Sequence, residues 1–128
     1  MNEPVVETRD LSMRFGGVVA VNHVSLTLRE RELRCLIGPN GAGKSTFFKC
    51  LTGQLDPGHD GGRVLVRGQD VTGWRPYRIV RLGVGIKTQV PSVMNGLTVL
   101  ENRGLSARRV HGRAGADGAV EEAVSELE

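Results

Sequence analysis

The sequence predicts an α/β fold in which short strands, glycine-rich turns and helices alternate along a single domain. Residues 5–11 and 18–28 are rich in β-branched residues, and the second run alternates apolar with polar side chains, which is typical of a half-buried strand. Residues 33–37 form a short apolar run before a glycine-rich loop, so we expect a third strand there. From Lys44 the apolar side chains fall on one helical face, and Gly53 is suited to end that helix.

The later elements follow from capping and turn residues. Residues 63–67 predict a brief strand, and residues 75–82 predict a helix with Thr72 as its cap. Thr98 and Glu101 match a capping box, in which the hydroxyl accepts the amide at the Glu position while the carboxylate reaches back. A helix should therefore start there, and the acidic final segment predicts a last amphipathic helix.

The composition is ordinary for a soluble globular chain, with 39% hydrophobic and 24% charged residues among 128. No apolar run approaches the roughly 18 residues of a membrane span. The polar N-terminus has no apolar signal region, so we expect a cytoplasmic location. Cys35 and Cys50 lie in apolar surroundings and are expected to be small buried side chains, with no disulfide or metal site between them.

Positive charge is concentrated in one stretch of the chain. Ten basic and two acidic residues lie between Arg63 and Arg113, whereas the charges of residues 117–128 are all acidic. A solvated surface is the simplest interpretation, and a face near anionic lipid or a nucleic-acid contact are the alternatives. No aromatic-rich strand or nucleic-acid motif accompanies the charge, so no nucleic-acid partner is predicted.

Residues 38–45 read Gly-Pro-Asn-Gly-Ala-Gly-Lys-Ser and fit the phosphate-binding pattern G-x-x-x-x-G-K-[ST] at every fixed position. Gly41 and Gly43 let the backbone wrap closely and point successive N–H groups inward. The helix that follows adds unpaired amides and the positive end of its dipole. The predicted triphosphate site consists of Gly38, Asn40, Gly41, Ala42, Gly43, Lys44, Ser45 and Thr46.

Three side chains of this loop have distinct chemistry. The Lys44 ammonium supplies a full charge at the β- and γ-phosphates, and Thr46 can donate to the α-phosphate. The Ser45 hydroxyl is a hard oxygen ligand suited to Mg²⁺. ATP and Mg²⁺ are therefore the expected ligands.

The run GPNGAGKST resembles the Walker A motif of ATP-binding-cassette (ABC) ATPases, and the likeness extends over nearly the whole chain. Phe15 matches an aromatic residue that stacks on adenine in that family, where a flat ring offers its π-face to the base. Gln89 matches the Q-loop glutamine, which reaches Mg²⁺ and links the nucleotide site to the membrane subunit. The resemblance implies that Lys44 and Gln89 serve catalysis and that Ser45 and Gln89 hold the metal.

Two shorter segments, residues 31–34 and 88–93, look most like the ATPase subunits for branched-chain amino-acid or urea uptake. Thr88 departs from the aromatic residue usual before the Q-loop glutamine. The family resemblance implies a P-loop NTPase of the ABC type, truncated, with three parts. These are an antiparallel β region (residues 1–30), a P-loop core (31–90) and the start of a helical subdomain (91–128).

The resemblance also implies partners. In this family, two ATPase subunits close on ATP and move a membrane-spanning permease, which the Q-loop region contacts. A periplasmic or extracellular solute-binding protein acts indirectly, and the ATPase lies on the inner face of the plasma membrane. The solute does not touch the ATPase subunit, so its sequence does not name the solute.

Several family motifs are absent from the sequence: it has no LSGGQ-like signature, no apolar strand ending in Asp-Glu and no switch histidine. We therefore expect a fragment or truncated reading frame that binds ATP better than it hydrolyses it. By resemblance, the strand before the P-loop lies between strands of the later segment, so its edges should be unpaired. The alternatives are a standalone nucleotide-binding or regulatory module, and a small P-loop kinase with residues 103–113 as a lid.

Overall fold

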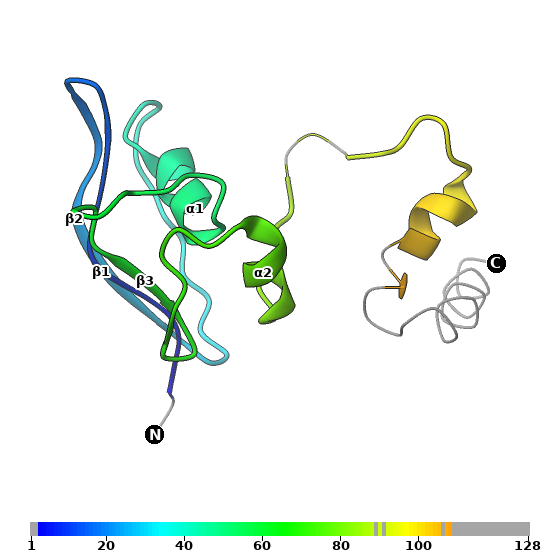
Figure 1. The fold of residues 1–128 in the computed structure, drawn as a ribbon, viewed down its shortest axis with the longest axis horizontal. Helices are drawn as coiled ribbons and strands as arrows, with labels where there is room; N and C mark the ends of the chain where they lie inside the picture. Colours follow the sequence, from blue (N-terminus) through cyan, green and yellow to red (C-terminus); the bar gives the residue numbers. More distant parts are fainter. Residues whose placement is uncertain (1–2, 89, 91, 106, 109–128) are drawn as a thin grey trace. The chain divides into compact units, whose positions relative to one another are not determined.

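The structure is a computed structural model that describes residues 3–88, 90, 92–105, 107 and 108. Contacts divide the chain into two compact units, with the division between Ile86 and Lys87. The first unit holds six elements along the chain (Figure 1): β1 (Pro4–Phe15), β2 (Val18–Arg29), α1 (Lys44–Leu51), β3 (Arg63–Val66), β4 (Gln69–Asp70) and α2 (Pro76–Arg81). No helix within the described residues is long and apolar enough to cross a bilayer.

The four strands form one antiparallel sheet in the order β2-β1-β3-β4. The two long strands make a hairpin whose tip is the Gly16-Gly17 turn, with Phe15 opposite Val18. β3 pairs with the first half of β1, with Val6 opposite Val66. Both predicted N-terminal strands are confirmed, and the first is longer than its apolar pattern because it continues to the turn.

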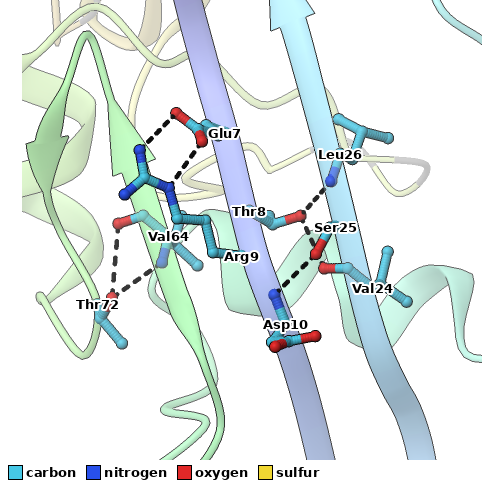
Figure 2. A network of polar contacts seen from close by, with 9 residues as sticks. All are labelled: Glu7, Thr8, Arg9, Asp10, Val24, Ser25, Leu26, Val64 and Thr72. Atoms are coloured by element: carbon cyan, nitrogen blue, oxygen red, sulfur yellow. Dashed lines mark hydrogen bonds and ion pairs between the residues drawn. The ribbon is translucent and has the colours of Figure 1, made fainter.

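The ladder between β1 and β2 is interrupted just after Thr8, where side-chain hydroxyls replace backbone bonds (Figure 2). Thr8 is 2% exposed, and its Oγ1 donates to the Val24 carbonyl and accepts from the Leu26 amide, both at 3.0 Å. Beside it, Asp10 has φ 50°, and its amide donates to Ser25 Oγ at 2.9 Å. Because buried backbone groups must be paired, these hydroxyls allow the bulge to exist inside the sheet.

One hydrophobic core holds the helices of the first unit against the sheet (Figure 1). α1 contributes Phe47 and Cys50 to it, and α2 contributes Ile79. The strands and the segment after β4 contribute Leu11, Val21, Val64, Val66 and Val71. Gly53 follows α1 with φ 73° and donates its amide to the Cys50 carbonyl, so the predicted C-terminal glycine of this helix is confirmed.

The start of α1 lies against β2 at a point where no side chain fits. A Cβ added to Gly43 would lie 2.0 Å from the Ala20 carbonyl oxygen, and Gly43 has φ 93°. Both the space and the left-handed backbone therefore require glycine. This contact fixes where the helix begins relative to the sheet.

Two predictions about the segment before α1 are wrong. Residues 33–39 are not paired as a strand, and Leu33 and Ile37 are each 92% exposed. An apolar run becomes a strand only where a neighbour accepts its hydrogen bonds, and the described residues contain no strand paired with it. Cys35 lies in this segment and is exposed, whereas Cys50 is buried as predicted.

The prediction that Thr72 caps α2 is also wrong, because Arg75 occupies the N-cap position. Thr72 Oγ1 instead accepts from the Val64 amide at 2.9 Å and donates to Asp70 Oδ1 at 2.6 Å. These bonds connect β3 to the segment after β4. The Thr72 hydroxyl, then its amide, and then Arg63 lower the pKa of Asp70.

In the second unit, residues 99–105 and 107–108 are helical. The predicted capping box is confirmed at the start of this helix. The Thr98 amide donates to Glu101 Oε2 at 2.7 Å, and the Glu101 amide donates to Thr98 Oγ1 at 3.2 Å. The Thr98 amide, followed by its hydroxyl, lowers the pKa of Glu101. The predicted helix beginning at Asp117 lies outside the described residues.

Replacing Thr8 with valine should lower the free energy of unfolding by about 2 kcal/mol, because two buried backbone groups lose their partner without a change of side-chain shape. Urea unfolding measures the difference. Thr27→Val is the matched control, since Thr27 on β2 is half-buried and its hydroxyl makes no hydrogen bond within the described residues. Equal losses in the two variants would contradict a special role for the Thr8 hydroxyl.

Candidate functional site

Residues 38–43 form a tight loop between the exposed segment and α1. Gly41 and Gly43 have φ 83° and 93°, and the Ala42 amide donates to the Pro39 carbonyl at 3.2 Å. Left-handed backbone at two positions curls the chain over the start of the helix, which is the shape that the glycine spacing predicts.

The N-terminus of α1 opens toward this loop. Its first intrahelical bond runs from the Phe47 amide to the Gly43 carbonyl at 2.8 Å, so the N–H groups of residues 44–46 precede the helical ladder. Gly43 has no side chain to cap them, and the first turn has no acidic residue. The amides and the helix dipole are therefore available to an anion.

Lys44 folds back over the loop. Its Nζ donates to the Gly38 carbonyl and to the Pro39 carbonyl, the latter at 2.7 Å. An ammonium has three protons, so one remains for a further acceptor. The lysine thereby neutralises two carbonyl oxygens that would repel a phosphate, and it places its charge beside the open amides.

Two hydroxyls complete the first turn of the helix. Ser45 is exposed and Thr46 is half-buried, and neither hydroxyl makes a hydrogen bond within the described part of the chain. Ser45 can offer its oxygen to Mg²⁺. No group of three or more His, Cys, Asp or Glu side chains suited to a metal occurs among the described residues.

A cavity of about 360 Å³ lies beside the loop. It is bounded by β2 around Ala20, by Leu36 and Ile37, and by Gly43, Lys44 and Phe47. A larger cavity of about 530 Å³ lies elsewhere, with Asp56, Asp60 and Thr72 among its walls and none of the loop residues. Its walls also include His59 and Arg63, but Arg63 is paired with Asp70. Because the Asp56 and Asp60 carboxylates repel phosphate, this cavity suits a nucleotide less well than the loop does.

Phe15 stands at the end of β1 and is 47% exposed. It pairs with Val18, which is two residues along β2 from Ala20, the residue that contacts Gly43. A strand rises about 3.4 Å per residue, so this end of the hairpin lies about 7 Å along β2 from that contact. This end of the hairpin therefore lies near the loop along β2, and the half-exposed ring is accessible to a planar group.

Gln89 lies outside the described residues, so its roles at the metal and in catalysis stay predictions. Sequence reasoning missed Ala20, whose carbonyl sets the position of the loop through the backbone alone. The signal that could have found it is a small residue in a strand otherwise rich in valine.

The comparison with known families matches the ABC transporter family over residues 21–128. The high-affinity branched-chain amino acid transport ATP-binding protein LivG of Salmonella typhimurium is 47% identical over 102 residues, covering 80% of this chain and 39% of that protein. The corresponding protein BraF of Pseudomonas aeruginosa is 41% identical over 102 residues, which cover 80% of this chain and 39% of that protein. The chain thus spans about 39% of the length of these curated relatives.

Solved structures agree with the family match. A nucleotide-free ATP-binding cassette from an ABC transporter has a TM-score of 0.70 at 29% identity, covering 88% of this chain and 44% of that one. The ADP conformation of the ATP-binding cassette MJ1267 has a TM-score of 0.69 at 31% identity, covering 84% of this chain and 41% of that one. The predicted fold class, an α/β P-loop core of the ABC type, is confirmed, and the chain belongs to the ABC transporter family of ATP-binding proteins.

Proposed function

We propose that this chain is the nucleotide-binding part of an ABC importer ATPase subunit and that its P-loop binds Mg-ATP. The observation that carries the proposal is the set of hydrogen-bond donors at residues 38–46. The N–H groups at the start of α1, the Lys44 ammonium that closes the loop, and the Ser45 and Thr46 hydroxyls all belong to this short segment. That segment is rich in donors and has no carboxylate in its first helical turn, which suits a triphosphate.

Each predicted site residue has a role in this proposal. Backbone N–H groups at Gly38 and at residues 40–46 bind phosphate oxygens, including those of Asn40, Gly41, Ala42 and Gly43, whereas Pro39 has no N–H to donate. Lys44 neutralises the β- and γ-phosphates, where it also stabilises charge during phosphoryl transfer. Ser45 and Gln89 hold Mg²⁺, and Phe15 stacks on adenine.

The transported solute is proposed to be a branched-chain amino acid, because LivG and BraF carry that description. The urea alternative has no counterpart in those names. The proposed partners are a membrane-spanning permease contacted around Gln89, a second ATPase subunit and, indirectly, a solute-binding protein. The chain would then lie at the cytoplasmic face of the membrane.

We further propose that this chain alone binds ATP more readily than it hydrolyses it. Hydrolysis needs a positioned water and charge stabilisation on the transferring phosphoryl group. The sequence contains no LSGGQ-like signature and no Asp-Glu after an apolar strand to supply them. Release of phosphate from Mg-ATP by the chain alone would refute this part. No release of phosphate would be equally consistent with a standalone binding module. Binding of the chain to the permease would then exclude that alternative.

Lys44→Ala should weaken Mg-ATP binding about 100-fold, because it removes a charged donor to the phosphates. It also removes the hydrogen bonds from the Lys44 ammonium to the Gly38 and Pro39 carbonyls. Isothermal titration measures the dissociation constant. Lys49→Ala is the matched control, since Lys49 is an exposed lysine in the last turn of the same helix. An unchanged affinity in the Lys44 variant would refute the phosphate site.

Phe15→Ala should weaken ATP binding by about tenfold, the expected loss for one stacked base, and should leave inorganic triphosphate binding unchanged. Phe48→Ala is the matched control because Phe48 is similarly exposed, at 53%. Equal losses for ATP and triphosphate would show that Phe15 supports the loop and does not contact adenine.

A further inference from the structure

The helix α2 and its N-cap residue carry a row of exposed arginines whose charge the nucleotide site does not use. Arg75, Arg78 and Arg81 are all exposed and are spaced by three residues. Arg75 is the N-cap residue and has an extended backbone, whereas Arg78 and Arg81 lie within α2, about 60° apart around the helix axis. We call these three residues, together with Trp74 and Tyr77, the α2 arginine surface.

Aromatic rings position two of these guanidinium groups. The Arg78 guanidinium carbon lies 4.0 Å from the centroid of the Trp74 ring, and that of Arg81 lies 5.6 Å from the centroid of the Tyr77 ring. Both distances are within the range of cation–π attraction. The two charges are therefore held against the helix, so less side-chain entropy is lost when they bind a partner.

No carboxylate neutralises the three arginines in the part of the chain that the structure describes. The ion pairs there join Arg9 to Glu7, His23 to Asp10, Arg34 to Glu32, and Arg63 to Asp70. Helix stability does not explain Arg75, because a positive charge at a helix N-terminus opposes the dipole.

The hydrophobic core holds the α2 arginine surface in place. Ile79 is 1% exposed in the hydrophobic core, and Trp74 packs against that core from a half-buried position. α2 is therefore held on the core, with the Trp74 ring at the boundary between the core and solvent and the Tyr77 ring 58% exposed.

We propose that the α2 arginine surface binds the phosphate groups of an anionic lipid membrane. Planar guanidinium groups pair with phosphate oxygens through two parallel bonds. Trp and Tyr favour the headgroup level because one part of each ring is apolar and the other polar. Two charges about 60° apart on α2, with a third at its N-cap, suit a broad layer of mobile headgroups better than one extended acidic peptide, which would follow a narrower line.

Vesicle binding tests the proposal without nucleotide, so its outcome is independent of the ATP site. Trp74 is the single tryptophan of the chain, and its fluorescence therefore reports this surface directly. The chain is titrated with vesicles of phosphatidylcholine alone and of phosphatidylcholine mixed with phosphatidylglycerol. We expect binding and a Trp74 emission change with the mixed vesicles, weakened by salt, and neither with phosphatidylcholine alone.

The triple variant Arg75→Gln, Arg78→Gln, Arg81→Gln should lose about 100-fold in vesicle affinity. The matched control is Arg14→Gln, Arg31→Gln, Arg67→Gln, which removes the same charge from exposed arginines elsewhere and should stay close to the unsubstituted chain. Replacing the three arginines with lysine keeps the charge but removes the paired bonds to phosphate, so it should leave binding between that of the glutamine variant and that of the unsubstituted chain. Equal losses in the two glutamine variants, or no binding to the mixed vesicles, would overturn the proposal. Binding to polyglutamate but not to vesicles would overturn it in favour of an acidic protein partner.

Discussion

The close approach of Gly43 to the Ala20 carbonyl is the constraint on which the rest of the first unit depends. Any side chain at residue 43 would have to occupy space that lies 2.0 Å from that oxygen, so only glycine lets α1 begin against β2. The same contact brings Phe47 into the core and leaves the first amides of the helix open beside the sheet. Core packing and the phosphate site are thus consequences of a single backbone contact.

Electrostatics at the loop follow from that placement. The carbonyls of Gly38 and Pro39 would otherwise present negative partial charge to an anion, but both accept hydrogen bonds from Lys44. With no acidic residue in the first turn of α1, the remaining donors are matched to phosphate before any ligand arrives. Donors that are already oriented require little reorganisation on binding, which is why such loops bind tightly.

Local chemistry could be predicted from the sequence, whereas long-range pairing could not. The P-loop glycines, the end of α1 at Gly53 and the capping box at Thr98 each depend on a few neighbouring residues, and all three are confirmed. The segment 33–37 was expected to be a strand, but an apolar pattern does not specify a partner for its hydrogen bonds. Thr72 has the chemistry of a helix cap, yet its hydroxyl bonds to β3 because the sheet places Val64 beside it. The bulge at Thr8 likewise depends on which strands meet, and the close contact at Ala20 depends on where α1 meets the sheet.

The central claim is that residues 38–46 are the nucleotide site and that the larger cavity is not. Amide chemical shifts of the isotope-labelled chain, followed during titration with Mg-ATP, test it most directly, because they report every backbone N–H at once. The account predicts the largest shifts at residues 41–46, with smaller changes at Phe15. Shifts centred on the walls of the larger cavity, such as Asp56 and Asp60, or no change at saturating Mg-ATP, would contradict it.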